Sequence, residues 1–475
     1  MKHKSLTSAL SLILCALLLL SIGGCKSDEN EGGYQKKSSL DTNEQVTLRI
    51  ASSQNPWTEM DSVIAKFETV YPNCTVVCEP IENYTDNLTL RLEQDEKKID
   101  IFPTVNITKD TKYRDKALNL ISEESAKILD LSGANAGLVR NFRDTTVENT
   151  QLAIPYGAEM RGMYVNKTLL KKYDLAVPKT RAELLHCCEV LYAAGLVPLQ
   201  SDAGSFAQQL LYPYICNSVV NGGNYQQMYD AIENTESGIS EYFRDAYTFL
   251  YDLVQKGYYD YDRVKAETPY TFDGNAVKAL DFLNIIKVSE DVYEKKDDIG
   301  GIAFITSTQA FGLELEKAKS DYHSEIEYEF ILSPVGQDGG CAYLSPADGL
   351  AINKNSDHVT WALEFLNFFF TPEINKAFAK EAGKIPNTSD ALLQFDVPAD
   401  RTSDVGQMTF SYPFYKTVTT LMCAGYEDMI GMSKMNAKKH MTDNGDGTYS
   451  IKYSLEDYLT RLETEFQQAK KSQSK

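Results

Sequence analysis

The chain has 475 residues, of which 43% are hydrophobic and 24% charged, a composition typical of a globular protein long enough for two lobes or domains. Its formal net charge of −20 argues against binding to nucleic acid or anionic lipid, because both need clustered lysine and arginine. The composition says little about a neutral ligand, although the 29 tyrosines offer rings with a hydroxyl tip that suit amphipathic molecules.

Residues 1–24 resemble an export signal. Lys2 and Lys4 give a positive start, a mostly apolar run follows over residues 6–20, and small residues come next. The stretch Ile22-Gly23-Gly24-Cys25 resembles the bacterial lipobox, in which the cysteine is alkylated with diacylglycerol and becomes the first residue of the mature protein. This predicts a lipoprotein anchored through Cys25, with a plain signal peptide or an uncleaved membrane anchor as the alternatives.

Residues 25–45 are polar, contain glycine and serine, and show no apolar period. A segment of this kind cannot bury enough surface to offset the entropy that it would lose on ordering. We therefore expect a flexible tether that holds the folded body close to the membrane.

Strands and helices alternate from residue 46 onward. Val46, Leu48 and Ile50 alternate with polar residues and predict a first strand at 46–51. The elements expected next are a helix over residues 60–70, a strand beginning at 75–77, a polar helix at 83–96 and a strand at 99–102. This order favours parallel sheets flanked by helices.

The middle of the chain begins with a strand, a turn and a second strand at residues 151–166. A helix follows, for which Thr180 and Glu183 are spaced as in a capping box and Gly195 supplies the C-terminal stop. Residues 205–290 are expected to be largely helical, with tyrosine-rich segments.

Strand-like runs return at residues 301–305, 328–332 and 349–352, and a strongly apolar helix follows at 359–370, in which Trp361 is expected to be a core residue.

The stretch Asp443-Asn444-Gly445-Asp446-Gly447 is expected to be a hairpin turn. Its acids stand at positions one and four, unlike the alternating acids of a calcium-binding EF-hand loop. A last amphipathic helix is expected at 454–470.

The nine cysteines include no pair or Cys/His cluster with zinc spacing, and no metal site is expected. Cys74 and Cys78 fall in an expected strand, whereas Cys187 and Cys188 are adjacent in an expected helix. Buried free thiols are expected here rather than structural disulfides.

Several motifs follow one another in a fixed order between residues 46 and 390. They are the helix ending at Phe67–Pro72, Asp100-Ile101-Phe102, Ile154-Pro155-Tyr156, the G-x-Y-x-N-K stretch at Gly162–Lys167, the P-x-T start at Pro178, the A-A-G-x-x-P stretch at Ala193–Pro198, the apolar helix ending at Pro372-Glu373, and Lys384-Ile385-Pro386. In this order they resemble the solute-binding proteins of carbohydrate ABC importers, called extracellular solute-binding protein family 1. The chain departs from the family pattern at Arg181, where tryptophan is usual, and at Ile305–Thr308, which replaces a G-G-x-W signature.

The resemblance implies an α/β fold of the periplasmic-binding-protein type, with two α/β lobes joined by a multi-strand hinge and the ligand cleft between them. The N-terminal lobe would comprise residues 46–154 and 331–370, and the C-terminal lobe residues 155–330 and 371–475.

The resemblance also implies a function. The protein would capture a small-molecule ligand, a sugar or oligosaccharide, by hinge closure and deliver it to the membrane permease subunits of an ABC transporter. It would act as a lipid-anchored monomer at the outer face of the bacterial cytoplasmic membrane, with no cofactor.

Candidate ligand-binding residues are polar or aromatic side chains at strand ends facing the cleft, where carboxylates and amides pair with hydroxyl groups and rings stack on sugar faces. Those of the first lobe are Gln54, Asn55, Trp57, Tyr84 and Asp100. The alternatives are a turn with helix capping for Gln54 and Asn55, a core ring for Trp57 and a structural hydrogen bond for Asp100.

The remaining candidates are Tyr156, Glu159, Arg161, Asp202, Thr308 and Asp348. The first three sit between two apolar strands, where polar side chains need partners, and an ion pair between Glu159 and Arg161 is the alternative to ligand contact. Asp202 follows an apolar strand, Thr308 occupies the place of the missing G-G-x-W signature, and Asp348 precedes a crossover strand.

Two other classes of function were weighed against binding and transport. Glu159 and Asp202 can be imagined as the acid/base pair of a glycosidase, but nothing in the spacing selects them from 67 acids. The sequence contains no G-x-S-x-G, H-E-x-x-H or phosphate-loop motif, so no catalytic residue is expected. A ligand-loaded sensor or a polysaccharide-binding surface protein would use the same fold, and the sequence does not separate these roles from transport.

Overall fold

The computed structural model describes residues 34, 40, 43–53, 57–94, 96–104, 107, 111–140, 142–143, 147, 149–201, 227, 237–259, 279–289, 292–336, 339–340, 343–391, 441–444 and 449–473. The chain divides into two compact units, Met1–Leu40 and Asp41–Lys475, and every element named below belongs to the second. The expected export signal at residues 1–24 lies outside the described residues, as does most of the expected tether. Within the described part, no helix has the length and apolar character needed to cross a membrane.

The first sheet has five strands, in the order β2 (Cys74–Pro80), β1 (Val46–Ser52), β3 (Ile101–Thr104), β12 (Gly349–Ile352) and β4 (Ile154–Pro155). β1 is parallel to β2 and to β3, whereas β12 is antiparallel to β3 and to β4. The sheet is therefore mixed, and its parallel part is the part that the alternation of early strands and helices predicted.

Four longer helices accompany this sheet: α2 (Thr58–Val70), α3 (Tyr84–Glu93), α15 (Val359–Phe369) and α16 (Pro372–Glu381). Phe67 of α2 packs against Phe365 and Phe368 of α15, with ring centroids 5.1 and 5.3 Å apart. Trp361 is 3% exposed, which confirms that it is a core residue. Three shorter helices, α4 (Thr111–Arg114), α5 (Glu123–Ala126) and α6 (Ala136–Arg140), lie in the long connection between β3 and β4.

The second sheet is centred on β5 (Gly157–Asn166). Its strand order is β10 (Tyr328–Ile331), β5, β9 (Ile302–Thr308) and β6 (Val197–Ser201), and β11 (Tyr343–Pro346) and β13 (Ile385–Pro386) also pair with β5. Its helices are α7 (Lys167–Lys172), α8 (Arg181–Ala193) and α14 (Phe311–Asp321).

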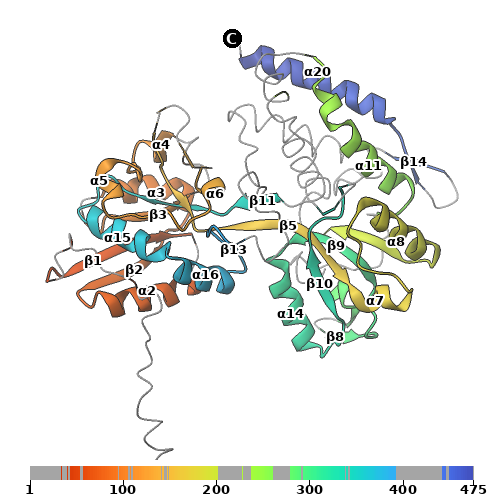
Figure 1. Cartoon of the computed structure of the whole chain (residues 1–475), viewed down its shortest axis with the longest axis horizontal. Coiled ribbons are helices and arrows are strands. Elements are labelled where there is room, and N and C mark those ends of the chain that lie inside the picture. Colours follow the sequence, from red (N-terminus) through yellow and green to blue (C-terminus); the bar gives the residue numbers. More distant parts are fainter. Residues whose placement is uncertain are drawn as a thin grey trace, which may run out of the picture. The chain divides into compact units, whose positions relative to one another are not determined.

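Two chain segments pass directly from one sheet to the other. Tyr156 alone separates β4 from β5, and Ala347-Asp348 separates β11 from β12. The backbones of the two passages are bonded to each other: Tyr156 N donates to the carbonyl of Asp348 at 3.1 Å, and Ala347 N donates to the carbonyl of Gly157 at 2.9 Å. We call residues 154–158 and 346–349 the crossing segments; Figure 1 shows β5 running from them into the second sheet.

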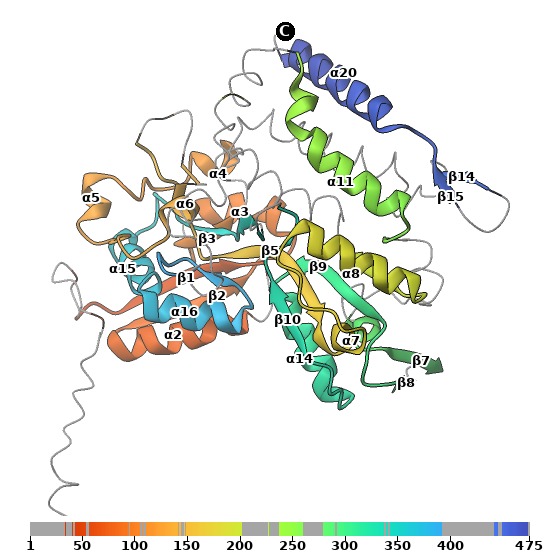
Figure 2. The ribbon, with the colours of Figure 1, turned by 45° about the vertical axis from the view of Figure 1, so that its right-hand side comes forward.

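The C-terminal helix α20 (Leu455–Gln473) lies along α11 (Arg244–Gln255), as Figures 1 and 2 both show. Tyr247 and Tyr458 pack with ring centroids 4.9 Å apart, and a 3-10 helix at Ile239–Phe243 precedes α11. The helix predicted at 454–470 is thereby confirmed. So is the hairpin predicted around residues 443–447, because β14 (Met441–Asp443) pairs antiparallel with β15 (Tyr449–Ile451).

Predictions that depend on contacts between residues close in sequence agree with the structure. Thr180 caps α8 by accepting from Glu183 N at 3.3 Å, and Glu183 reaches back to Lys179 N at 2.7 Å. Gly195 has a φ of +79° and ends that helix as predicted. Cys74, Cys78, Cys187 and Cys188 are free thiols.

The strand, turn and second strand predicted at residues 151–166 are β4, a bend at Tyr156 and β5, and the two strands belong to different sheets.

One local prediction was wrong. The end of the expected helical region is a strand: β7 (Ile285–Ser289) pairs with β8 (Val292–Lys295), and β7 is rich in the β-branched residues that favour strands.

The packing of α16 and β11 differs from the expected lobe boundaries. α16 lies beside α2 (Figure 2) and packs Phe378 against Phe369 of α15 at 5.0 Å, so it belongs with the first sheet although it begins after residue 371. β11 belongs to the second sheet, although the expected boundary placed residues 331–370 in the N-terminal lobe. Long-range packing decides both assignments, and the local sequence carries no signal of it.

Candidate ligand-binding site

An aromatic group lies beside the first crossing segment. Trp57, directly before α2, packs edge-on against Tyr156 at 6.0 Å and Phe378 at 6.4 Å, and the last two rings are 5.6 Å apart. Trp57 and Tyr156 are 6% and 9% exposed. The structure therefore gives Trp57 the packing of a core ring, at the point where the chain crosses between the sheets.

Three charged side chains gather around the crossing segments. Glu159 on β5 accepts a hydrogen bond from Lys384, which directly precedes β13, and both side chains are half-buried. Burial raises the pKa of the Asp348 carboxyl; Lys384 opposes the rise and Glu159 adds to it. Arg161 adds a second cation on the same face of β5 as Glu159, so these described groups carry two negative and two positive charges, a balance that suits a neutral ligand.

Tyr84 and Tyr156 add hydroxyl groups to this cluster. Tyr84 begins α3 and donates to the carbonyl of Pro103 at 2.7 Å. Burial, followed by the nearby Asp348 carboxylate, raises the pKa of both phenols well above the ordinary value. Both tyrosines therefore stay protonated at neutral pH, and Tyr156 remains a hydrogen-bond donor beside Asp348.

The alternating direction of side chains along β5 explains why Glu159 and Arg161 are only partly buried. Alternate residues of a strand point to opposite faces. Ala158 and Met160 are fully buried and pack with Ile385, whereas Glu159 and Arg161, on the other face, are only partly buried. Arg161 lies opposite Thr308 of β9 in the register of the sheet, so these two predicted residues are neighbours.

Asp100 is not part of this cluster. It lies just before β3, and the four residues to Thr104 span about 13 Å of strand. Its carboxylate accepts from Arg49 N at 2.7 Å and from the hydroxyl of Ser356 at 2.5 Å, and His358 lies 3.4 Å away. Asp100 therefore makes the structural hydrogen bonds that were the alternative to ligand contact, and it is not part of the candidate site.

Four other predicted residues, Gln54, Asn55, Asp202 and Cys25, lie outside the described residues.

Sequence reasoning missed Lys384, Phe378 and Gln309. Lys384 was visible, since it opens the Lys384-Ile385-Pro386 motif, but a single lysine after a helix resembles an ordinary surface residue. Gln309 follows β9; its amide oxygen accepts from Met160 N at 2.6 Å and its amide nitrogen donates to the carbonyl of Gly383 at 2.8 Å. It thereby ties β5 to the segment that carries Lys384, a role that no local pattern announces.

No metal centre is evident in the described part of the chain, where no group of three or more His, Cys, Asp or Glu side chains is placed to hold an ion. The cluster at the crossing segments instead combines aromatic rings, neutral hydroxyl groups and carboxylate acceptors. These groups suit a neutral ligand that carries several hydroxyls and apolar CH faces.

The sequence matches the family model described as bacterial extracellular solute-binding protein over residues 52–376. The chain belongs to this family of solute-binding proteins, which confirms the resemblance stated from its motifs, and its two-lobed α/β fold is that of periplasmic binding proteins.

Several solved structures share this fold. A family 1 extracellular solute-binding protein from Bifidobacterium longum subsp. infantis is 16% identical, with a TM-score of 0.60 and coverage of 89% of this chain and 99% of that one. The sugar-binding protein MalE from Xanthomonas citri is 14% identical, with a TM-score of 0.61 and coverage of 90% and 98%. A sugar transporter from Bacillus licheniformis in complex with stachyose is 16% identical, with a TM-score of 0.51 and coverage of 89% and 100%. No curated protein matches the sequence.

Proposed function

We propose that this protein is the substrate-binding lipoprotein of an ABC importer and that it captures a neutral sugar or oligosaccharide beside its crossing segments. The observation that carries the proposal is the grouping of Tyr84, Tyr156, Glu159 and Asp348 around the passages between the two sheets of a solute-binding fold. The structural relative from Bacillus licheniformis holds stachyose and that from T. maritima holds maltose, which supports a carbohydrate as the ligand class.

Binding works through the hinge in this proposal. The crossing segments are short, so the lobes change their relative angle by small backbone rotations there. Ligand bound between the lobes favours the closed arrangement because only that arrangement lets groups of both lobes contact it. The closed protein is then recognised by the membrane permease subunits. Glu159 and Asp348 act as hydrogen-bond acceptors for hydroxyl groups and not as catalytic acids.

A binding assay tests the ligand class. Thermal unfolding of the purified protein is measured with mono- and oligosaccharides, and with peptides, polyamines and polyols as controls. A sugar at one hundred times its dissociation constant should stabilise the folded state by about 2.7 kcal/mol. Glu159→Gln should reduce the shift, whereas Glu124→Gln, the same substitution at an exposed residue of α5, should not. A shift with a control compound and with no sugar would refute the carbohydrate assignment.

Import and anchoring need separate tests. Uptake of the radiolabelled sugar should fall when the gene is deleted and return with the wild-type gene; unchanged uptake would point to sensing rather than import. For the anchor, the wild-type protein should be recovered in the membrane fraction with a diacylglycerol mass on Cys25. Cys25→Ser should lose that mass, and the same membrane recovery and mass spectrum for both proteins would rule the anchor out.

A further inference from the structure

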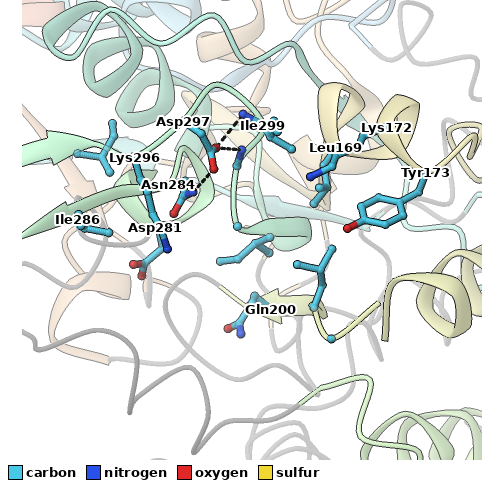
Figure 3. Close-up of a pocket in the computed structure, with 16 residues that line it drawn as sticks. Leu169, Lys172, Tyr173, Gln200, Asp281, Asn284, Ile286, Lys296, Asp297 and Ile299 are labelled. Atoms are coloured by element: carbon cyan, nitrogen blue, oxygen red, sulfur yellow. Dashed lines mark hydrogen bonds between the residues drawn. The ribbon is translucent and has the colours of Figure 1, made fainter. Parts of the chain in front are cut away.

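A cavity of about 570 Å³ lies in the second lobe, apart from the crossing segments. Figure 3 shows residues of α7, of the β7–β8 hairpin and of the entrance to β9 around it. The cavity reaches Ile302 at the start of β9, whereas Thr308 ends that strand, and six residues of strand span about 20 Å. Its volume falls within the range of about 300–1,000 Å³ that ligand pockets occupy.

The charges of the side chains around this cavity sum to zero. Lys172 and Lys296 supply two positive charges, and Asp281 and Asp297 supply two negative ones. Asp297 is already bonded, accepting from Ile299 N at 2.9 Å, from Gly300 N at 3.1 Å and from the Asn284 amide at 2.9 Å (Figure 3). Two cations and two carboxylates leave no excess charge around the cavity, so it favours a neutral guest.

Gln200 is the residue that indicates a ligand. It is 5% exposed and lines the cavity, but its amide atoms are not among the fully buried, unpartnered side-chain atoms of the described residues. The amide is therefore open to the cavity, where the hydroxyl groups of a guest can pair with it. The hydroxyl of Tyr173 offers a second polar group, and isoleucine and leucine side chains supply apolar walls.

Two neighbouring glycines directly before β9 differ in whether the structure has room for a side chain at their position. Gly300 has a φ of +86°, and a Cβ there would lie 2.2 Å from the Asn166 amide nitrogen, so the fold itself requires glycine. At Gly301 the nearest atoms to an added Cβ are the carbonyl of Asp281 at 3.5 Å and the Asn284 amide oxygen at 3.8 Å. Both belong to lining residues, so a side chain at 301 would enter the cavity without backbone strain.

We propose that this cavity is a second binding site, separate from the one at the crossing segments, and that it takes a small neutral polyhydroxyl molecule such as a monosaccharide or a cyclic polyol. Hydroxyl groups of the guest pair with the Gln200 amide and the Tyr173 hydroxyl, and its CH faces lie on the aliphatic walls. The site goes beyond the proposed function, since it needs no hinge closure.

Titration calorimetry with D-glucose and myo-inositol tests the proposal, with glucose 6-phosphate and glucosamine as charged controls. The proteins compared are the wild type, Glu159→Gln, Gly301→Leu and Gln200→Leu, with Gln94→Leu as a matched exposed control. Binding of a neutral probe should persist in Glu159→Gln and Gln94→Leu and be lost in Gly301→Leu. Gln200→Leu should weaken it about tenfold, the equivalent of one lost hydrogen bond.

The outcomes separate this site from the proposed function. If Gly301→Leu keeps the wild-type circular dichroism and binds both neutral probes as tightly as the wild type, the second site is refuted and the proposed function is untouched. Loss of all binding in Glu159→Gln alone has the same meaning. A sugar-induced shift in the unfolding screen that survives in Glu159→Gln and disappears in Gly301→Leu would refute the proposed function and leave the second site.

Gln200→Leu decides the matter if Gly301→Leu fails to fold. Removing an amide that is open to the cavity should leave the melting temperature of the free protein unchanged or raise it, while affinity for the neutral probe falls. Unchanged affinity in this variant overturns the proposal.

Discussion

Removing the ammonium group of Lys384 is the sharpest test of the charged cluster at the crossing segments. The side chains of Lys384 and Glu159 are 20% and 34% exposed, between a surface pair and a buried one. Surface pairs contribute about 0–1 kcal/mol, and breaking a fully buried pair costs about 3–5 kcal/mol. We therefore expect Lys384→Met to lower the free energy of unfolding by about 2 kcal/mol at pH 7.

The free energy of unfolding lost in Lys384→Met should depend on pH, and the titration of Asp348 determines the direction of this dependence. Burial and Glu159 raise the pKa of this carboxyl, and Lys384 holds the rise back. A carboxyl whose pKa is higher in the folded than in the unfolded state destabilises the fold above the folded-state pKa, and this penalty is absent below the unfolded value near 3.9. Without Lys384 the penalty grows, so the cost of Lys384→Met should be largest near pH 7 and should shrink as the pH falls toward 4.

Urea unfolding followed by circular dichroism measures both effects. A double-mutant cycle with Glu159→Gln should give a coupling energy of about 1–2 kcal/mol. The control pair is Lys127 with Glu124 of α5, both strongly exposed, for which the coupling should stay below about 0.5 kcal/mol. Equal coupling in the two pairs, or a loss for Lys384→Met that does not change between pH 7 and pH 4, would show that the cluster is electrostatically unimportant.

Three further predictions concern single side chains. Trp57→Ala should destabilise the protein by about 3 kcal/mol, because a ring 6% exposed between two aromatic neighbours leaves a cavity; urea unfolding measures this, and a loss below about 1 kcal/mol would contradict the packing. Asp348→Asn should raise the melting temperature at pH 7, where the ionised carboxylate opposes folding, and calorimetry should show weaker sugar binding. A lower melting temperature would count against the raised pKa of Asp348. Gly300→Ala should destabilise by about 2 kcal/mol or more, and Gly301→Ala by well under 1 kcal/mol, as thermal unfolding should show; similar losses at both would contradict the backbone analysis.

Helices and strands with a clear local pattern could be predicted from the sequence. The alternation at 46–51 gave β1, the apolar run at 359–370 gave α15, and the Thr180 cap gave the start of α8. What the sequence did not show was which sheet a strand joins. β4 and β5 are separated by Tyr156 alone, yet the pairing of Leu350 with Ile154 draws β4 into the first sheet, and partners almost 200 residues apart leave no mark on the local sequence.

The residues of the candidate site could be predicted to a similar extent. Tyr156 and Glu159 were predicted because polar groups between apolar strands need partners, Tyr84 because it begins a polar helix, and Asp348 because it precedes a crossover strand. The structure brings these four together. Asp100 met the same criterion, but its partners Arg49 and Ser356 come from other elements, and pattern alone does not reveal that its carboxylate is already occupied.

The placement of the cluster also bears on how a ligand would close the two lobes. The hydrogen bonds between the crossing segments fix Tyr156 and Asp348 relative to each other, whatever the angle between the sheets. Trp57 precedes α2 beside the first sheet and Thr308 ends a strand of the second, so the separation of these two depends on that angle. A sugar that bonds to Asp348 can therefore be held in either arrangement, but additional contacts with both lobes are available only at one angle. The free energy of those additional contacts is the whole of what a ligand can contribute to closure, because contacts made equally in both arrangements shift no equilibrium.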